Sequence, residues 1–446
     1  MSGKIHLQMN NGNHLGENER GALSHNYDAI VIGGGPAGSA ASTILAQKGR
    51  RVVVLEKEKF PRYHIGESLL PYGYFTLERI GILDKIKQSH FTKKFSVQFV
   101  TQDGRSSVPF YFHTHLQHDA AQTWQVLRSE LDQMLLDNAR EKGAEVMEEI
   151  TVRDAIRNDM GAVTGVRAVD KDGQPHEFHA PITIDASGRD AFFVTRNGWK
   201  IRDAFLNKIA VWTYYKGAQR DPGVDEGATT VAYVPEKGWF WYIPLAGDVV
   251  SVGVVAEKDY LMRSTKDLKE IFYQEVAQNV WIQNHLAGGE QFGPFRITGE
   301  YSYRSRYCAS DGLLLAGDAF AFLDPVFSSG VMLALRSGEL AAEAADAALT
   351  DGDFSAGRFK DYGAEFCKRI ESMRRLVYAF YDHNFSFREF LKKYPHLAGD
   401  VTDCLIGNWL KDFEPMYAAM REFAGNIPAA LEHGKPLMED AHAARP

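Results

Sequence analysis

Two short apolar runs near the start of the chain enclose an alanine-rich stretch. The run 27–32 (YDAIVI) is typical of a strand buried on both faces, and it stops at the three glycines 33–35. Pro36 at a first-turn position and the alanine-rich sequence after it predict a helix, which Gly49 ends. A second apolar run, 51–56 (RVVVLE), follows. The pattern predicts a β-α-β unit.

Later segments continue this pattern, with one interruption. Apolar residues at helical spacing cover 128–141, and short apolar runs at 182–184 and 313–316 each end in a glycine-containing turn. The alanine-rich stretch 330–349 predicts another helix. Between 205 and 257, strands broken by Gly and Pro predict a separate antiparallel sheet.

These patterns predict an α/β protein in which a Rossmann-type domain is interleaved with a second sheet. We assign 27–95, 120–202 and 300–350 to the nucleotide-binding domain, 96–119 and 203–299 to an antiparallel substrate-domain sheet, and 351–446 to a C-terminal helical cap. The polar segment 1–26 is expected to be a flexible tail. The aromatic-rich cap is consistent with closing a substrate chamber, lining a homodimer interface or filling its own core.

Composition narrows the functional class. The 446 residues are 45% hydrophobic and 24% charged, and the net charge of −8 offers no basic surface for a nucleic acid. No apolar run is long enough to predict a membrane span. Cys308, Cys367 and Cys404 are widely separated, which indicates neither a zinc site nor a disulfide framework and favours a cytoplasmic location.

A glycine motif marks a dinucleotide site. Gly33, Gly35 and Gly38 lie between the first predicted strand and its helix, and Glu56 ends the next strand. The first glycine permits the tight turn, the second lets the backbone approach a pyrophosphate, and the third lets helix and strand pack closely. Glu56 can bind both hydroxyls of a ribose, which favours FAD or NAD over a 2′-phosphorylated nucleotide. A plain turn is the alternative.

Gly317 and Asp318 favour FAD over NAD. They follow the predicted strand 313–316 and precede a helix. A carboxylate at this point lies beside a cofactor hydroxyl, which suits the ribityl chain of a flavin. An aspartate that only caps the helix is the alternative.

Four motifs are specific when taken together: GGGPAG at 33–38, FPRYHIGESLLP at 60–71, WFWYIP at 239–244 and GDAFAFLDPVFSSGVMLA at 317–334. They resemble the flavin-dependent halogenases, a group within the FAD-dependent monooxygenase fold, over about residues 27–349. The WxWxIP pattern and the DPVFSSG loop are similar to members acting on phenols and pyrroles. The resemblance implies an oxidoreductase of secondary metabolism that uses FADH₂, O₂ and chloride or bromide.

The resemblance also implies a reaction. Reduced FAD, supplied by a separate flavin reductase, would form a C4a-hydroperoxide with O₂, and halide would attack its distal oxygen to give hypohalous acid. In the family a lysine then delivers the halogen, and the spacing of Lys94 and Phe99 matches that lysine and the aromatic residue after it. An amine in a dry tunnel has a lowered pKa and is nucleophilic. Lys93 is the reserve candidate, and a solvated surface lysine is the alternative.

By the same resemblance, Trp239, Trp241, Ile243 and Pro244 would form a wall between flavin and substrate. Alternation along a strand puts Trp239, Trp241 and Ile243 on one face, whereas Pro244 takes the other. Such a wall would keep the substrate away from the flavin and leave halide as the only nucleophile within reach. A core strand buried on both faces is the alternative.

Other residues are given roles near the cofactor by the resemblance. The amides of Ser329 and Gly330, in the turn before the predicted helix, would attract halide, and a turn that holds no ion is the alternative. Cofactor contacts are implied at Ala37, Arg128, Gly330 and Val331. A plain surface arginine at the start of a helix is the alternative for Arg128.

Two departures from the family pattern bear on the substrate. Tryptophan halogenases carry a catalytic glutamate where this chain has Phe327, which favours an electron-rich ring such as a phenol over free tryptophan. Met332 stands where many phenol-type relatives have histidine. The substrate is therefore expected to be a small aromatic molecule, either free or tethered to a carrier protein.

Two other functions stay open. One is a flavin hydroxylase or reductase of the same fold, and the other is a flavin-binding protein without catalytic activity. His113, His115 and His118 lie close together, but no carboxylate or cysteine completes a ligand pattern, so no metal site is expected.

Overall fold

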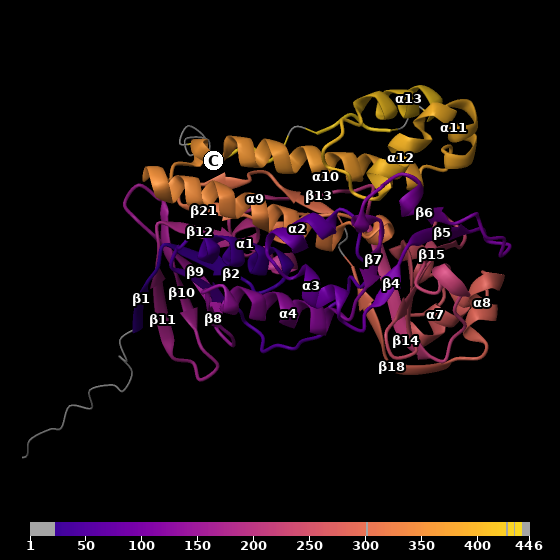
Figure 1. The fold of residues 1–446 in the computed structure, drawn as a ribbon, viewed down its shortest axis with the longest axis horizontal. Helices are drawn as coiled ribbons and strands as arrows, with labels where there is room; N and C mark the ends of the chain where they lie inside the picture. Colours follow the sequence, from indigo (N-terminus) through magenta and orange to yellow (C-terminus); the bar gives the residue numbers. More distant parts are fainter. Residues whose placement is uncertain (1–22, 300–301, 425–426, 432, 439–446) are drawn as a thin grey trace, which may run out of the picture.

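The computed structural model describes residues 23–299, 302–424, 427–431 and 433–438. A six-stranded sheet with the order β20-β21-β12-β2-β3-β8 forms the centre of the nucleotide-binding part (Figure 1). The strands are β2 Ala29–Ile32, β3 Val52–Leu55, β8 Glu145–Met147, β12 Ile182–Asp185, β20 Ala309–Ser310 and β21 Leu313–Leu315. All pairs are parallel except β20 with β21. The apolar runs of β2, β3, β12 and β21 are buried along their whole length, as in a covered parallel sheet.

Helices from distant parts of the chain meet beside this sheet. Helix α1 (Pro36–Gln47) packs against both α9 (Gly330–Asp351) and α4 (Arg128–Glu141). The approach of α1 to α9 requires a glycine at 338, since a Cβ there would lie 2.2 Å from the carbonyl oxygen of Ala37. The shorter helices of this part are α2 Gly73–Arg79, α3 Leu83–Lys87 and α5 Phe192–Arg196.

Three small sheets complete the nucleotide-binding part. One has the order β1-β11-β10-β9, the second β13-β19-β22, and the third pairs β4 with β7. Their strands are β1 Leu23–Asn26, β4 Thr92–Lys94, β7 Thr123–Gln125, β9 Thr151–Arg157, β10 Val163–Val169, β11 Pro175–His179, β13 Lys200–Arg202, β19 Tyr303–Ser305 and β22 Ala321–Phe322.

Part of the expected flexible tail is a β-strand. Residues 23–26 form β1, which pairs in parallel with β11, and His25 stacks on Phe178 with ring centroids 4.8 Å apart. The polar composition of 23–26 does not predict a strand, because the strand forms only by pairing with β11, which lies far along the chain. The rest of the expected tail, 1–22, lies outside the described residues.

A seven-stranded sheet forms the second part, in the order β18-β14-β17-β16-β15-β5-β6. Its strands are β5 Ser96–Val100, β6 Phe110–Tyr111, β14 Lys208–Lys216, β15 Thr229–Tyr233, β16 Trp239–Leu245, β17 Val249–Glu257 and β18 Glu290–Thr298. The pairs are antiparallel except β15 with β5, which is parallel.

The two faces of this sheet belong to two different cores. Phe240 and Tyr242 pack into a local core that includes residues of α7 (Leu268–Val276) and α8 (Val280–Leu286). Trp239, Trp241 and Ile243 pack into the main core of the protein. The helices at 258–286, which also include α6 (Lys258–Leu261), are an addition to the pure sheet expected from the sequence.

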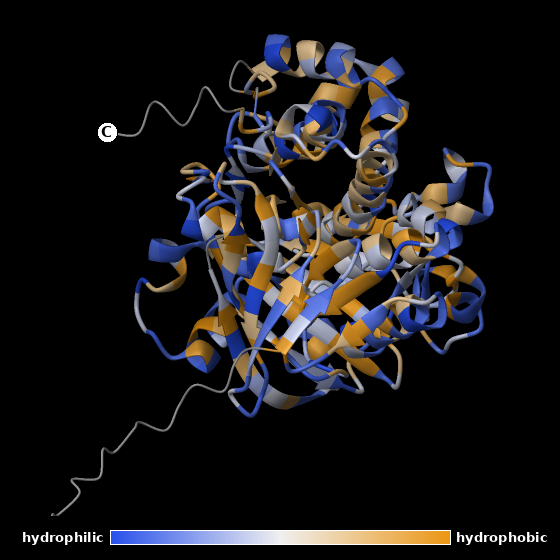
Figure 2. Cartoon of the chain, turned by 90° about the vertical axis from the view of Figure 1, so that its left-hand side faces the viewer, coloured by the Kyte–Doolittle hydropathy of each residue, from blue (hydrophilic) through white to orange (hydrophobic). Residues whose placement is uncertain are grey.

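The C-terminal part is helical, with α10 Lys360–Tyr381, α11 Phe387–Lys393, α12 Ala398–Leu405 and α13 Glu414–Ala424. In Figure 1, α10 lies alongside α9, and α11, α12 and α13 gather at one end, above the seven-stranded sheet. Figure 2 shows hydrophobic strands in the interior and hydrophilic turns on the outer helices. The predicted fold class, with its Rossmann-type domain, second sheet and helical cap, is confirmed. No helix among the described residues is long and apolar enough to cross a membrane.

Candidate active site

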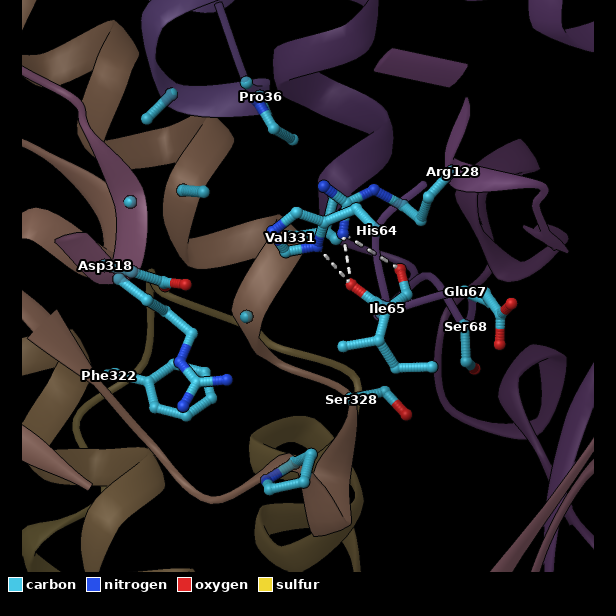
Figure 3. Close-up of a pocket in the computed structure, with 18 of the residues that line it drawn as sticks. Pro36, His64, Ile65, Glu67, Ser68, Arg128, Asp318, Phe322, Ser328 and Val331 are labelled. Atoms are coloured by element: carbon cyan, nitrogen blue, oxygen red, sulfur yellow. Dashed lines mark hydrogen bonds between the residues drawn. The ribbon is translucent and has the colours of Figure 1, made fainter. Parts of the chain in front are cut away.

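A cavity of about 280 Å³ lies between the two sheets, and we call it the cofactor cavity. Its lining comes from the turn before α1, the end of β3, the loop 62–68, the strands β15 and β16, and the start of α9. Figure 3 shows Arg128 beside His64 and Ile65 of this loop, and Asp318 with Phe322 on the opposite side of the pocket. The predicted residues that line it are Gly33, Gly35, Ala37, Glu56, Arg128, Trp239, Trp241, Ile243, Asp318, Gly330 and Val331.

The glycine motif shapes one end of this cavity. Gly33 has a φ of +98°, and a Cβ there would lie 2.5 Å from the carbonyl oxygen of Ala186. A Cβ on Gly38 would lie 1.9 Å from the carbonyl oxygen of Gly33, so this glycine serves helix packing and is not among the lining residues. At Gly35 the nearest atom to a Cβ is 3.6 Å away, which leaves the helix N-terminus open to a phosphate.

Glu56 is held in place by backbone amides. Its Oε2 accepts a hydrogen bond from the Gly34 amide at 2.7 Å, and its Oε1 accepts one from the Glu58 amide at 2.8 Å. The residue is 4% exposed and lines the cavity. Each carboxylate oxygen keeps a free lone pair, so Glu56 can still accept hydrogen bonds from ribose hydroxyls.

Arg128 is buried and fastens the loop over the cavity. Its Nε and Nη2 donate to the two carboxylate oxygens of Asp132 at 2.8 and 2.9 Å, and its Nη1 donates to the carbonyl oxygen of Ile65 at 2.7 Å. Because Arg128 is buried, the alternative interpretation of it as a plain surface arginine is excluded. The pKa of nearby His64 is lowered to about 4, mainly by burial and then by the charge of Arg128. That imidazole is therefore neutral at physiological pH.

At the other end of the cavity, burial raises the pKa of Asp318 to about 6, against the opposing charges of Arg189 and Arg128. Gly317 has a φ of +60°, and its amide donates to the Ser337 hydroxyl, so it shapes the turn and is not among the lining residues. The residues therefore fit FAD: an open helix N-terminus, a ribose acceptor at Glu56 and a buried carboxyl at Asp318 lie in one cavity.

Lys94 is buried, with no exposed surface. Its Nζ donates to the Ser68 hydroxyl at 2.8 Å and to the Leu69 carbonyl oxygen at 3.1 Å, and it lies 5.5 Å from the centre of the Phe112 ring. Desolvation lowers its pKa to about 7. By contrast, Lys93 is exposed. Lys94 is therefore not a solvated surface lysine, whereas Lys93, the reserve candidate, lies at the surface.

Lys94 lines a second, smaller cavity of about 30 Å³, which we call the lysine cavity. The other lining residues are mainly apolar: Leu70, Val97, Phe99, Phe110, Phe112, Val326, Phe327, Ser328, Thr402, Leu405 and Ile406. Val326 and Ser328 also line the cofactor cavity, so the two cavities share a wall. Ser68 forms a second link, because it lines the cofactor cavity and accepts from Lys94.

Trp239 and Trp241, the indoles of the predicted wall, both lie on β16 and line the cofactor cavity. The ring centroids of Trp239 and Trp241 are 6.3 Å apart. The Trp239 Nε1 donates to the Tyr381 hydroxyl at 2.7 Å, and that hydroxyl donates to Asp324 at 2.9 Å. Pro244 is a correction: it is not among the residues that line the cofactor cavity, because alternation along β16 turns it to the opposite face.

The loop predicted to bind halide presents a different serine from the one expected. Ser328 has a φ of +55° and lines both cavities. Ser329, the N-cap residue of α9, is buried and is not among the lining residues of either cavity. Gly330 does line the cofactor cavity. The left-handed conformation of Ser328 ends the short helical turn Pro325–Phe327, and residue spacing does not reveal it.

Several residues of the site were not predicted from the sequence. Arg62 and Arg189 line the cofactor cavity, as does Glu67, whose burial raises its pKa to about 7. The GES motif containing Glu67 is recognisable in the sequence, but no local pattern predicts a buried carboxyl there. Within the described residues no group of three or more histidines, cysteines or carboxylates could hold a metal ion.

Cavity, glycine motif and buried carboxyls together define an FAD-binding oxidoreductase. The chain matches the sequence model of the tryptophan halogenase family over residues 28–126 and 104–388. It is 30% identical to a 1H-pyrrole-2-carbonyl-[peptidyl-carrier protein] chlorinase of Pseudomonas fluorescens, over 92% of this chain and 95% of that protein. It is 34% identical to the corresponding brominase of Pseudoalteromonas luteoviolacea, over 74% of this chain and 79% of that protein.

Solved structures agree with these relatives. The flavin-dependent brominase Bmp2 superposes with a TM-score of 0.80 at 29% identity, covering 89% of this chain and 99% of that one. The chain therefore belongs to the tryptophan halogenase family. The resemblance to flavin-dependent halogenases, the assignment as an enzyme and the FAD cofactor are confirmed.

Proposed function

We propose that this flavin-dependent halogenase modifies a small electron-rich ring, such as a pyrrole, with oxidised halogen that forms in the cofactor cavity and reacts at Lys94. The supporting observation is the buried amine of Lys94, which lies in a separate cavity sharing Val326 and Ser328 with the cofactor cavity. Reduced FAD with O₂ supplies the two-electron oxidation of chloride or bromide.

The chain's own residues determine where the halogen goes. At a pKa of about 7, much of Lys94 is a neutral amine at physiological pH, able to take a halogen or to donate a hydrogen bond to hypohalous acid. Trp239 and Trp241 form a wall of the cofactor cavity, and they would keep an organic ring away from the flavin. Ser328 and Gly330 are the proposed halide contacts, since both line the cavity beside the start of α9.

The lining of the lysine cavity supports an apolar, activated ring. Phe327 stands where a catalytic carboxylate would assist deprotonation, and the polar lining side chains are those of Lys94, Ser328 and Thr402. A ring that readily loses its own proton needs no such carboxylate. The two relatives named for carrier-bound pyrroles support a tethered pyrrole-2-carbonyl group as the first substrate to test.

We further propose that a separate flavin reductase supplies FADH₂, as the family resemblance implies. The cytoplasmic location and the homodimer remain predictions from the sequence.

The test is halogenation by the purified protein with FAD, a flavin reductase, NADH, O₂ and either bromide or chloride. Substrates are pyrrole-2-carbonyl thioester on a carrier protein, the free acid and a phenol, and products are identified by halogen isotope patterns in mass spectrometry. Lys94→Met is expected to lower halogenation at least about 100-fold with FAD binding unchanged. The matched control is Lys93→Met, which should retain full activity. Halide-independent hydroxylation, or full activity of Lys94→Met, would contradict the proposal.

A further inference from the structure

A row of hydroxyl groups leads from an exposed tyrosine to a buried carboxyl of the cofactor cavity. Tyr63 is 43% exposed, and its hydroxyl lies 2.9 Å from that of Tyr214. The Tyr214 hydroxyl donates to Oε1 of Glu67 at 2.8 Å. Glu67 is 3% exposed and lines the cofactor cavity. Figure 3 shows Glu67 beside Ser68 at the end of the loop that covers this cavity.

The hydrogen bonds of this row share one direction. Trp212 Nε1 is a donor only, and it donates to the Tyr63 oxygen at 2.7 Å. Because Tyr214 gives its proton to Glu67, the Tyr63 hydroxyl donates to the Tyr214 oxygen. Each hydroxyl therefore donates inward, from the exposed residue toward the cavity.

Glu67 is able to hold and release a proton. Its Oε2 is buried and has no hydrogen-bond partner among the described residues. Burial raises the pKa of this carboxyl to about 7, and the Tyr214 hydroxyl and the charge of Arg128 oppose this rise. Arg296, which lies 3.7 Å from the Tyr63 ring centre, is a charged group at the outer end of the row.

We propose that Tyr63, Tyr214 and Glu67 form a proton relay that carries protons from solvent into the cofactor cavity. This proposal rests on the proposed function, for which the net reaction is FADH₂ + O₂ + X⁻ + R–H + H⁺ → FAD + R–X + 2 H₂O. Reduced FAD and the C–H bond are oxidised and O₂ is reduced. One proton is taken up in each turnover and ends in water. Trp239 and Trp241 line this cavity, and FAD would fill much of it when bound, so a fixed path for this proton has a clear use.

The relay is distinct from the lysine site. Lys94 donates to Ser68 and Leu69, whereas the relay approaches Glu67 from β14. A merely structural role would be to fasten the loop 62–68 to β14. That role predicts no titration of Glu67 near neutral pH and no effect on proton-dependent rates.

The first test is an infrared pH titration of the FAD-loaded protein. The carboxyl C=O band lost in Glu67→Gln should disappear from the wild-type spectrum with a midpoint near pH 7. A carboxyl that is ionised throughout pH 5 to 9, or protonated throughout, would refute the relay. This measurement needs no halide and no substrate, so it is independent of whether the protein halogenates.

The second test is stopped-flow reaction of the reduced holoenzyme with O₂ and bromide, in H₂O and D₂O, with a pH-indicating dye. Oxidation of bromide, FADH₂ + O₂ + Br⁻ + H⁺ → FAD + HOBr + H₂O, takes up one proton, whereas the same mixture without bromide is the blank and takes up none. Tyr214→Phe removes one hydroxyl of the row and should slow proton uptake at least about tenfold. The matched control is Tyr215→Phe, the neighbouring residue on β14, whose hydroxyl instead donates to Tyr273.

Equal proton uptake by Tyr214→Phe and Tyr215→Phe would overturn the relay even if Glu67 titrates. Both tests succeeding without a halogenated product would instead refute the proposed function and leave the relay in place. Retained FAD binding and circular dichroism in Tyr214→Phe show that the variant has folded.

Discussion

Replacing Lys94 by methionine should stabilise the protein while abolishing its reaction. Methionine fills similar space without a charge, so the substitution removes a buried ammonium with little change in packing. The pKa of the amine falls from 10.5 to about 7 on burial, which corresponds to about 5 kcal/mol against the charged form. Loss of the hydrogen bonds to Ser68 and Leu69 opposes this gain by about 1–3 kcal/mol.

The pH dependence separates these two contributions. Between pH 7 and 10.5 the unfolded state holds the lysine proton and the folded state does not, so wild-type stability rises with pH by about 1.4 kcal/mol per unit. Lys94→Met lacks this dependence. Its stability advantage over wild type should therefore shrink by about 2 kcal/mol between pH 7 and 9. The loss of hydrogen bonds does not vary with pH in this range.

The assay is urea unfolding of both proteins at pH 7, 8 and 9, with FAD at one saturating concentration. Comparing the two proteins at each pH cancels the titration of every other group, including Glu67. Lys93→Met, at an exposed position next to Lys94, is the control and should keep a constant difference from wild type. A difference between Lys94→Met and wild type that stays constant from pH 7 to 9 would refute the lowered pKa.

Two further substitutions test contacts between elements that are far apart in the sequence. Gly338→Ala would place a Cβ 2.2 Å from the carbonyl oxygen of Ala37, so α1 must move away from α9. Denaturant unfolding should show a loss of stability of about 1–3 kcal/mol. Unchanged stability would contradict this packing. Tyr381→Phe removes the hydroxyl that the Trp239 indole N–H and the Asp324 carboxyl share. The melting temperature should fall by an amount equivalent to about 1–3 kcal/mol. An unchanged melting temperature would show that this hydroxyl is not required for stability.

The sequence by itself determined the nucleotide-binding unit. The strand, glycine turn and helix at 29–47 depend on neighbouring residues, because only glycine tolerates the φ of +98° at 33 and the packing at 38. Alternation along one strand likewise placed Trp239 and Trp241 on one face. The motifs were specific enough to indicate the family, which the comparisons confirm.

Tertiary structure alone decided which side chains share a cavity. The Tyr214 hydroxyl meets a carboxyl 147 residues earlier. Ser328, which has a left-handed conformation, lines both cavities, whereas Ser329 lines neither. Burial of Lys94 likewise results from segments that approach it from several parts of the chain, among them Phe112 and Thr402. Residue spacing predicts local structure. Desolvation depends on every segment that surrounds a group in space, and it therefore sets the pKa of Lys94 and of Glu67 in a way that spacing does not predict.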